Sequence, residues 1–212
     1  MIAPRGRETK HRDPLAVATD FQTINPALFA WQAFEPAVKC DLSSCALDGA
    51  DGLVFMDPIE LSEPALARLL HRRKPGAIIL TNGNHTRAAG ELRARLGVKV
   101  FAGADAIGLD IVADATLAGG QIAPGGMEII TLPGAGPGEI ALVGGGVACV
   151  GDALIHLPPE GLRFLPDKYC ADPDQMRHSL RKLLSYQFQI MTFAHGAPLV
   201  GTARRQLEQL LA

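Results

Sequence analysis

Short apolar runs separated by polar turns dominate the first third of the chain. Three of these runs, at 28–36, 39–48 and 52–58, have the length of β-strands. Asp-Gly pairs at 48–49 and 51–52 mark the turn between the last two. We therefore expect an early meander of three strands.

A helix is predicted next, from Ser62 to about Arg72. Ser62 is a suitable N-cap, and Pro64 fits a first-turn position. The apolar residues of this segment recur on one face, as in a helix packed on a sheet: Ala65, Leu66, Leu69 and Leu70. Pro75 and Gly76 then end the helix before the next strand.

The rest of the chain repeats the order of strands followed by helices. A buried strand at 77–81 leads into a helix at 86–96, which Gly97 ends as a C-cap. Later strands are expected at 98–102, 127–132, 139–144, 146–151 and 188–194, with one more inside the glycine-rich stretch 103–126. A proline-rich loop at 156–173 and helices at 173–185 and 201–211 complete the pattern. Two such halves fit an α/β fold with four layers, an αββα sandwich.

Candidate chemistry is concentrated in residues 76–90, where the apolar strand ends in a polar turn before the helix. This segment resembles the metal-binding segment of the metallo-β-lactamase superfamily, Thr-His-x-His-x-Asp-His, whose ligands gather at the end of a strand. Thr81 is present, but Asn82 and Asn84 stand where the first two histidines are expected. The resemblance thus implies the frame of a metallohydrolase without most of its ligands.

Three further segments support the resemblance, in the order of the family. The segment from Thr131 is similar to Thr-Pro-Gly-His-Thr-Pro-Gly-Ser, with Ala135 at the metal-binding histidine. The strand ending in Gly-Asp152 is similar to the one whose carboxylate bridges two metals, and His195-Gly-Ala-Pro is similar to the segment of the last ligand. The resemblance runs from about residue 28 to the C-terminus and implies the metallo-β-lactamase fold.

The turn can be aligned with the family in two ways. Without gaps, the four ligand positions carry Asn82, Asn84, Thr86 and Arg87. None of these is a good ligand, because zinc prefers imidazole, thiolate or carboxylate and a neutral amide competes poorly with water. In this alignment we expect His85 to point away and Arg87 to replace the cation through a salt bridge to Asp152.

A deletion of two residues in the turn gives the second alignment. His85, Asp152 and His195 then coincide with three of the four ligands of the family's second metal position, and Asn84 stands at the substituted fourth. Two imidazoles and a carboxylate make a credible catalytic-type metal triad with an open coordination position. The other metal position still lacks its three histidines.

Each of these residues also has a structural interpretation. His85 can pack beside the helix N-terminus, Asp152 can cap a turn through the backbone, and His195 can simply end a strand. The remaining histidines are isolated and are expected to be structural or solvated: His11, His71, His156 and His178.

We therefore expect either no metal or a single divalent metal, zinc, iron or manganese, and no dinuclear centre. The leading interpretation is a metallo-β-lactamase-like protein that has lost most metal ligands, is not a standard dinuclear metallohydrolase, and binds a small molecule or a partner protein. The alternative is a mononuclear metal-dependent hydrolase that uses His85, Asp152 and His195. A third is a structural module that binds no ligand.

Composition and charge exclude several classes of function and location. A net charge of −2 offers no basic face for nucleic acid, and no apolar run approaches the length of a membrane span.

The N-terminus lacks the apolar core of a secretory signal, and the four cysteines show no Cys-x-x-Cys spacing, so we expect a reduced, cytoplasmic protein. Residues 21–212 are expected to form one domain after a flexible N-terminal arm at 1–20. The oligomeric state is not defined by these features.

Overall fold

The computed structural model describes residues 16–71 and 73–212. Most of the N-terminal arm predicted over residues 1–20 lies outside the described residues. Its last part contains strand β1 (Val17–Ala18), which pairs in parallel with β6 (Glu60–Leu61). Strand structure therefore begins before the predicted domain boundary at residue 21.

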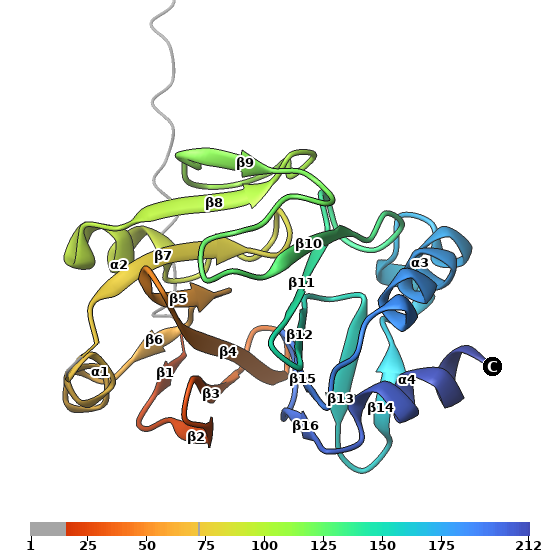
Figure 1. The fold of residues 1–212 in the computed structure, drawn as a ribbon, viewed down its shortest axis with the longest axis horizontal. Coiled ribbons are helices and arrows are strands. Elements are labelled where there is room, and N and C mark those ends of the chain that lie inside the picture. Colours follow the sequence, from red (N-terminus) through yellow and green to blue (C-terminus); the bar gives the residue numbers. More distant parts are fainter. Residues whose placement is uncertain (1–15, 72) are drawn as a thin grey trace, which may run out of the picture.

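Two β-sheets face each other in the middle of the molecule (Figure 1). The larger sheet has the strand order β2-β3-β4-β5-β7-β8-β9, with antiparallel pairs from β2 to β5 and parallel pairs from β5 to β9. Its strands are β2 (Gln22–Asn25), β3 (Leu28–Glu35), β4 (Cys40–Gly49), β5 (Gly52–Met56), β7 (Pro75–Leu80), β8 (Lys99–Gly103) and β9 (Ala115–Leu117).

The smaller sheet has the order β10-β11-β12-β15-β16, in which β12 and β15 are parallel. Its strands are β10 (Glu128–Thr131), β11 (Ile140–Gly144), β12 (Val147–Val150), β15 (Ile190–Thr192) and β16 (Leu199–Val200). A separate hairpin consists of β13 (Leu154–Leu157) and β14 (Gly161–Phe164).

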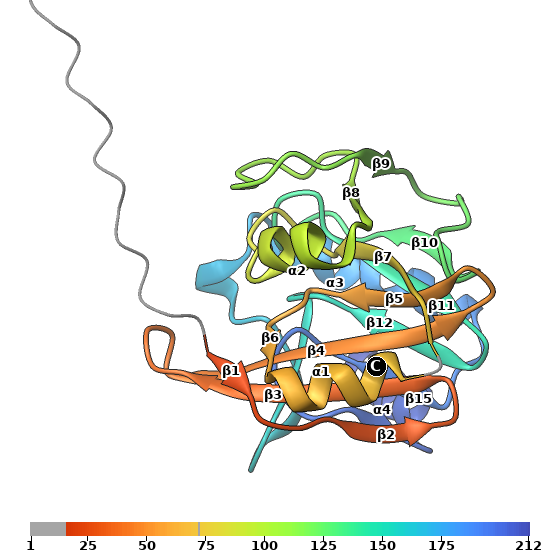
Figure 2. The same cartoon turned by 90° about the vertical axis from the view of Figure 1, so that its left-hand side faces the viewer.

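Helices cover the outer faces of both sheets, so that four layers stack as α, β, β and α (Figures 1 and 2). Helices α1 (Glu63–Leu70) and α2 (Ala89–Leu96) lie outside the larger sheet, and α3 (Pro173–Leu180) and α4 (Ala203–Leu211) outside the smaller one. Short 3₁₀ helices span Asp167–Tyr169 and Arg181–Ser185. The predicted αββα sandwich is confirmed. Within the described residues, no helix has both the length and the apolar character needed to cross a membrane.

The central strands are apolar on both faces because each face is covered by another layer. In β3, Phe29 and Trp31 belong to a buried cluster that includes residues of α1. The alternating residues Leu28 and Ala30 belong to a second cluster, which they share with residues of the smaller sheet. This alternation explains why β3 reads as an almost unbroken apolar run.

Three local predictions differ from the structure in detail. The segment 156–173 was predicted as a loop, but it contains part of β13 and all of β14. Ser62 stands at the predicted N-cap position of α1, but its side chain makes no capping hydrogen bond, because Oγ donates to the carbonyl of Thr19 at 2.9 Å. The helix predicted from residue 86 begins only at Ala89, since Arg87 has a φ of 35° that a right-handed helix does not allow.

Candidate metal centre

The candidate residues follow the C-terminal ends of four strands. His85 comes from the turn after β7, Asp152 follows β12, and His195 follows β15. Asp57 directly follows β5, the parallel neighbour of β7. Parallel strands end at the same edge of a sheet, which is where α/β folds gather their ligands.

His85, Asp152 and His195 converge on one point between the two sheets. Each offers a ligand atom, and these atoms all lie within 4.8 Å of one another. Oδ1 of Asp152 is 3.1 Å from Nε2 of His85 and 3.3 Å from Nε2 of His195. This oxygen is buried and, among the described residues, accepts no hydrogen bond of acceptable geometry. Buried carboxylate oxygens rarely lack a hydrogen bond, so the arrangement fits a cation held by all three groups.

Both histidines are fixed through their other ring nitrogen. Nδ1 of His85 donates to Oδ2 of Asp57 at 2.9 Å, and Nδ1 of His195 donates to the backbone carbonyl of Asp41 at 3.1 Å. Sγ of Cys40 also lies 3.4 Å from the latter nitrogen. An oxygen acceptor at Nδ1 keeps the proton there and leaves the Nε2 lone pair free, as metal-ligating histidines require.

Asp57 is itself held rigidly. The backbone N–H and the hydroxyl of Thr81 donate to its two carboxylate oxygens, the N–H at 2.8 Å. Burial alone would raise the pKa of Asp57, but His85, Arg87 and Thr81 together outweigh burial and lower it. Asp57 therefore remains a carboxylate that orients the His85 ring.

The cluster is buried on one side and open on the other. The side chain of His85 is 4% exposed, whereas those of Asp152 and His195 are 14% and 18% exposed. Burial would lower the pKa of His85, but the carboxylates of Asp152 and Asp57 raise it to about 10. Burial would likewise raise the pKa of Asp152, but His85 and His195 hold it well below its usual range. A cation bound at Nε2 of His85 would take the place of that stabilised proton.

Two polar residues lie beside the cluster, and one of them, Asn82, stands where the resemblance puts a ligand of the other metal. Asn82 donates from Nδ2 to Oε2 of Glu139 at 2.7 Å and to Oδ2 of Asp152 at 3.2 Å. Glu139 is 2% exposed, and burial together with Asp152 raises its pKa to about 8. Ala135, at the position of another lost histidine, is buried and has no ligand atom.

The geometry agrees with the second alignment of the turn and disagrees with the first. His85 faces Asp152 instead of pointing away. Arg87 forms no ion pair with Asp152 in the described structure; its guanidinium donates to the carbonyls of Ser43, Asp57 and Ala194 at 2.8, 3.1 and 3.2 Å. The salt bridge expected from the gap-free alignment was therefore wrong, because backbone carbonyls from three segments satisfy the guanidinium.

Asn84, the substituted fourth position, does not belong to this group in the described structure. The residue is exposed, and its backbone N–H donates to Oδ1 of Asn82 at 2.8 Å. The turn thus uses Asn84 to orient the amide of Asn82.

Three supporting residues were not predicted from the sequence: Asp41, Asp57 and Glu139. Asp57 carried a usable signal, because an aspartate directly after a buried strand lies at the same edge as the turn after β7. Glu139 lies inside the segment that begins at Thr131, where the family resemblance places a serine. Asp41 contributes only a backbone carbonyl, which residue identity does not encode.

Of the other histidines, His71 and His178 do not join the cluster, and His11 lies outside the described residues. His156 contacts the carbonyl of Ala197 through Nδ1 at 2.6 Å. The structural interpretation therefore holds for His156.

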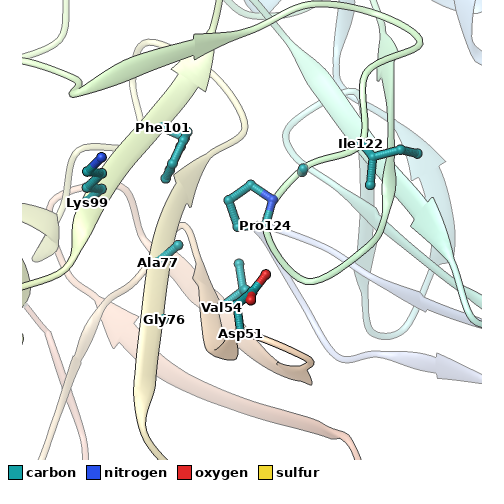
Figure 3. A pocket seen from close by; sticks show the side chains of 9 residues that line it. Asp51, Val54, Gly76, Ala77, Lys99, Phe101, Ile122 and Pro124 are labelled. Atoms are coloured by element: carbon teal, nitrogen blue, oxygen red, sulfur yellow. The ribbon is translucent and has the colours of Figure 1, made fainter.

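A pocket of about 420 Å³ lies away from the cluster (Figure 3). Asp51, Gly76 and Lys99 line it at the N-terminal ends of β5, β7 and β8, where Phe101 and Ile122 also contribute. Those ends are opposite to the edge that carries the candidate metal centre, so this pocket has no part in the chemistry of that centre.

The two facing sheets and the outer helices form an αββα sandwich, and the strand ends carry a His-Asp-His group that could hold a metal ion. A family model described as the metallo-beta-lactamase superfamily matches residues 22–210, and the chain belongs to this superfamily. A search of curated proteins finds no match.

Solved structures with the same fold are distant in sequence. A metallo-beta-lactamase from Pontibacter korlensis has a TM-score of 0.71 at 15% identity, covering 91% of this chain and 98% of that one. An archaeal metallo-beta-lactamase superfamily protein from Sulfolobus tokodaii has a TM-score of 0.62 at 16% identity, covering 81% and 80%. A family protein from Thermus thermophilus has a TM-score of 0.64 at 17% identity, covering 89% and 79%. At these identities the likeness shows the fold alone.

Proposed function

We propose that this protein is a mononuclear metal-dependent hydrolase in which His85, Asp152 and His195 hold one divalent ion: zinc, iron or manganese. The proposal rests on Oδ1 of Asp152, which accepts no hydrogen bond and lies 3.1 and 3.3 Å from two Nε2 atoms. The rings that carry these atoms are fixed by oxygen acceptors at Nδ1. Two imidazoles and one carboxylate are a sufficient protein ligand set for a catalytic site that keeps a position open. The geometry thus favours the alternative interpretation of the sequence over loss of all metal binding.

A bound ion supplies two effects that hydrolysis needs, a lowered pKa of water and polarisation of the scissile group. The protein contributes the surroundings. Asp57 and Asp41 hold the two rings in place, and the partial exposure of Asp152 and His195 lets water and substrate reach the open side. A small molecule with an ester-type bond is the class of substrate to screen first.

The hydrolase proposal predicts activity that depends on added metal. We expect protein stripped with a chelator to be inactive towards p-nitrophenyl esters and bis(p-nitrophenyl) phosphate, and protein reloaded with zinc, manganese or iron to hydrolyse at least one of them. His195→Ala should remove this activity, because it deletes one of three ligands. His178→Ala, which changes an exposed histidine on α3, should leave it intact.

The same assay can reject the proposal. Equal rates for stripped and reloaded protein, or for wild type and His195→Ala, would favour a ligand-binding or interaction protein without hydrolytic chemistry.

A further inference from the structure

We propose that Asn82 and Glu139 form a metal-free replacement for the second ion of a dinuclear centre, and that this pair positions Asp152 for a single metal. The inference rests on the proposed mononuclear site and adds two positioning residues to it. Asn82 stands at a lost histidine of the family pattern, and Glu139 is a buried carboxyl that the hydrolase proposal does not use.

The orientation of the Asn82 amide is determined by its partners. Oδ1 accepts the backbone N–H of Asn84 at 2.8 Å, so that Nδ2 must be the atom that faces the two carboxylates. Nδ2 then donates to Oε2 of Glu139 and to Oδ2 of Asp152. One neutral amide group thus contacts both carboxyl groups, where a dinuclear centre would have a second metal ion.

Glu139 holds Asn82 from the other side. Its Oε1 accepts the backbone N–H of Ala153 at 3.0 Å, and its Oε2 accepts Nδ2 of Asn82 at 2.7 Å. Both oxygens therefore face N–H donors, which fixes the carboxyl in one orientation. The anchor at Ala153 lies directly beside Asp152 in the chain, so the pair and the ligand share one backbone segment.

Two glycines make room for this pair. A Cβ on Gly136 would lie 3.0 Å from Cγ and Nδ2 of Asn82. A Cβ on Gly151 would lie 2.7 Å from Oε1 of Glu139 and 2.3 Å from Oγ1 of Thr81. A larger residue at position 136 or 151 would therefore collide with Asn82, Glu139 or Thr81.

The two carboxylate oxygens of Asp152 therefore have different roles. Oδ2 is held by Asn82, whereas Oδ1 has no hydrogen bond and faces His85 and His195. Loss of the Asn82 donor would free the carboxylate to rotate away from the two imidazoles. Residues that orient a metal ligand in this way typically change metal affinity by about 10- to 100-fold when they are removed.

The test measures Zn²⁺ affinity by competition with a chromophoric chelator and, separately, the unfolding midpoint of the metal-free protein. We expect Asn82→Ala to weaken Zn²⁺ binding by about 10- to 100-fold, and Glu139→Gln to weaken it by about tenfold, because an amide nitrogen would face an N–H donor. Asn84→Ala is the matched control in the same turn; it keeps the backbone N–H and should bind Zn²⁺ as wild type does.

The outcomes separate this inference from the proposed function. Wild-type affinity in both Asn82→Ala and Glu139→Gln, even with lowered unfolding midpoints, would show a merely structural pair and overturn the inference alone. Absence of binding of zinc, manganese and iron alike by wild type would overturn the hydrolase proposal and this inference together. Two tightly bound Zn²⁺ ions per wild-type chain would also overturn the inference, because the second ion would need the place of the pair. If Asn82→Ala does not fold, Glu139→Gln decides.

Discussion

Asp152→Asn is expected to weaken divalent metal binding by more than about 100-fold, since loss of an outer-shell partner alone costs about 10- to 100-fold. The substitution keeps the shape of the side chain but replaces a charged ligand by a neutral amide, which competes poorly with water for zinc. Oδ1 of Asp152 is the atom that faces both imidazoles, so no other group can take over its position. Chelator competition with Zn²⁺ measures the change.

Asp41→Asn is the matched control for this experiment. It makes the same chemical change close to the cluster, but His195 uses only the backbone carbonyl of Asp41, which the substitution retains. Zn²⁺ affinity should therefore change little. Equal losses in the two variants would indicate that overall negative charge, and not ligation by Asp152, attracts the ion.

Arg87→Met is expected to lower the free energy of unfolding by about 3 kcal/mol or more, because hydrogen bonds to charged groups contribute about 1.5–3 kcal/mol each. The guanidinium donates to the carbonyls of Ser43, Asp57 and Ala194, which come from β4 and from the loops after β5 and β15. These segments belong to both sheets, so the hydrogen bonds of Arg87 connect the two sheets beside the candidate metal centre. Because Arg87 is half-buried, water recovers part of this loss, and the expected change stays below the sum of the three hydrogen bonds. Urea denaturation of the metal-free protein measures it.

Arg87→Lys tests whether geometry or charge is responsible. Lysine keeps the positive charge but lacks the planar fork that serves several acceptors at once. We expect it to lose more than half as much stability as Arg87→Met. A lysine variant as stable as wild type would show that the charge near Asp57 is what matters, and the proposed tie between segments would be wrong.

The layers of the fold could be predicted because the apolar pattern is strong where strands are covered on both faces. Segments such as 28–36 and 52–58 carry this pattern, and the structure has β3 and β5 there. The hairpin β13–β14 was missed because its turn contains Pro158 and Pro159, which favour a loop prediction. The side-chain hydrogen bond of Ser62 could not be predicted from local sequence either, because its acceptor, the carbonyl of Thr19, is distant in the chain.

The candidate site was predictable in its three members but not in its surroundings. His85 entered the group only through an alignment with a shortened turn, and the backbone conformation of that turn decides between the alternatives. Glu139 and Asn82 meet across 57 positions of sequence. Such contacts depend on how the two sheets face each other, which local patterns do not specify.

The number of metal ions bound per chain decides whether His85, Asp152 and His195 hold one divalent ion. Purified protein would be incubated with zinc, manganese or iron, dialysed exhaustively, and analysed for metal and protein content together. We predict about one tightly bound ion per chain, since three protein ligands suffice for one catalytic-type site and the other position holds Asn82 and Ala135. If no metal is retained, or if two equivalents survive dialysis, these residues do not form a site for a single ion.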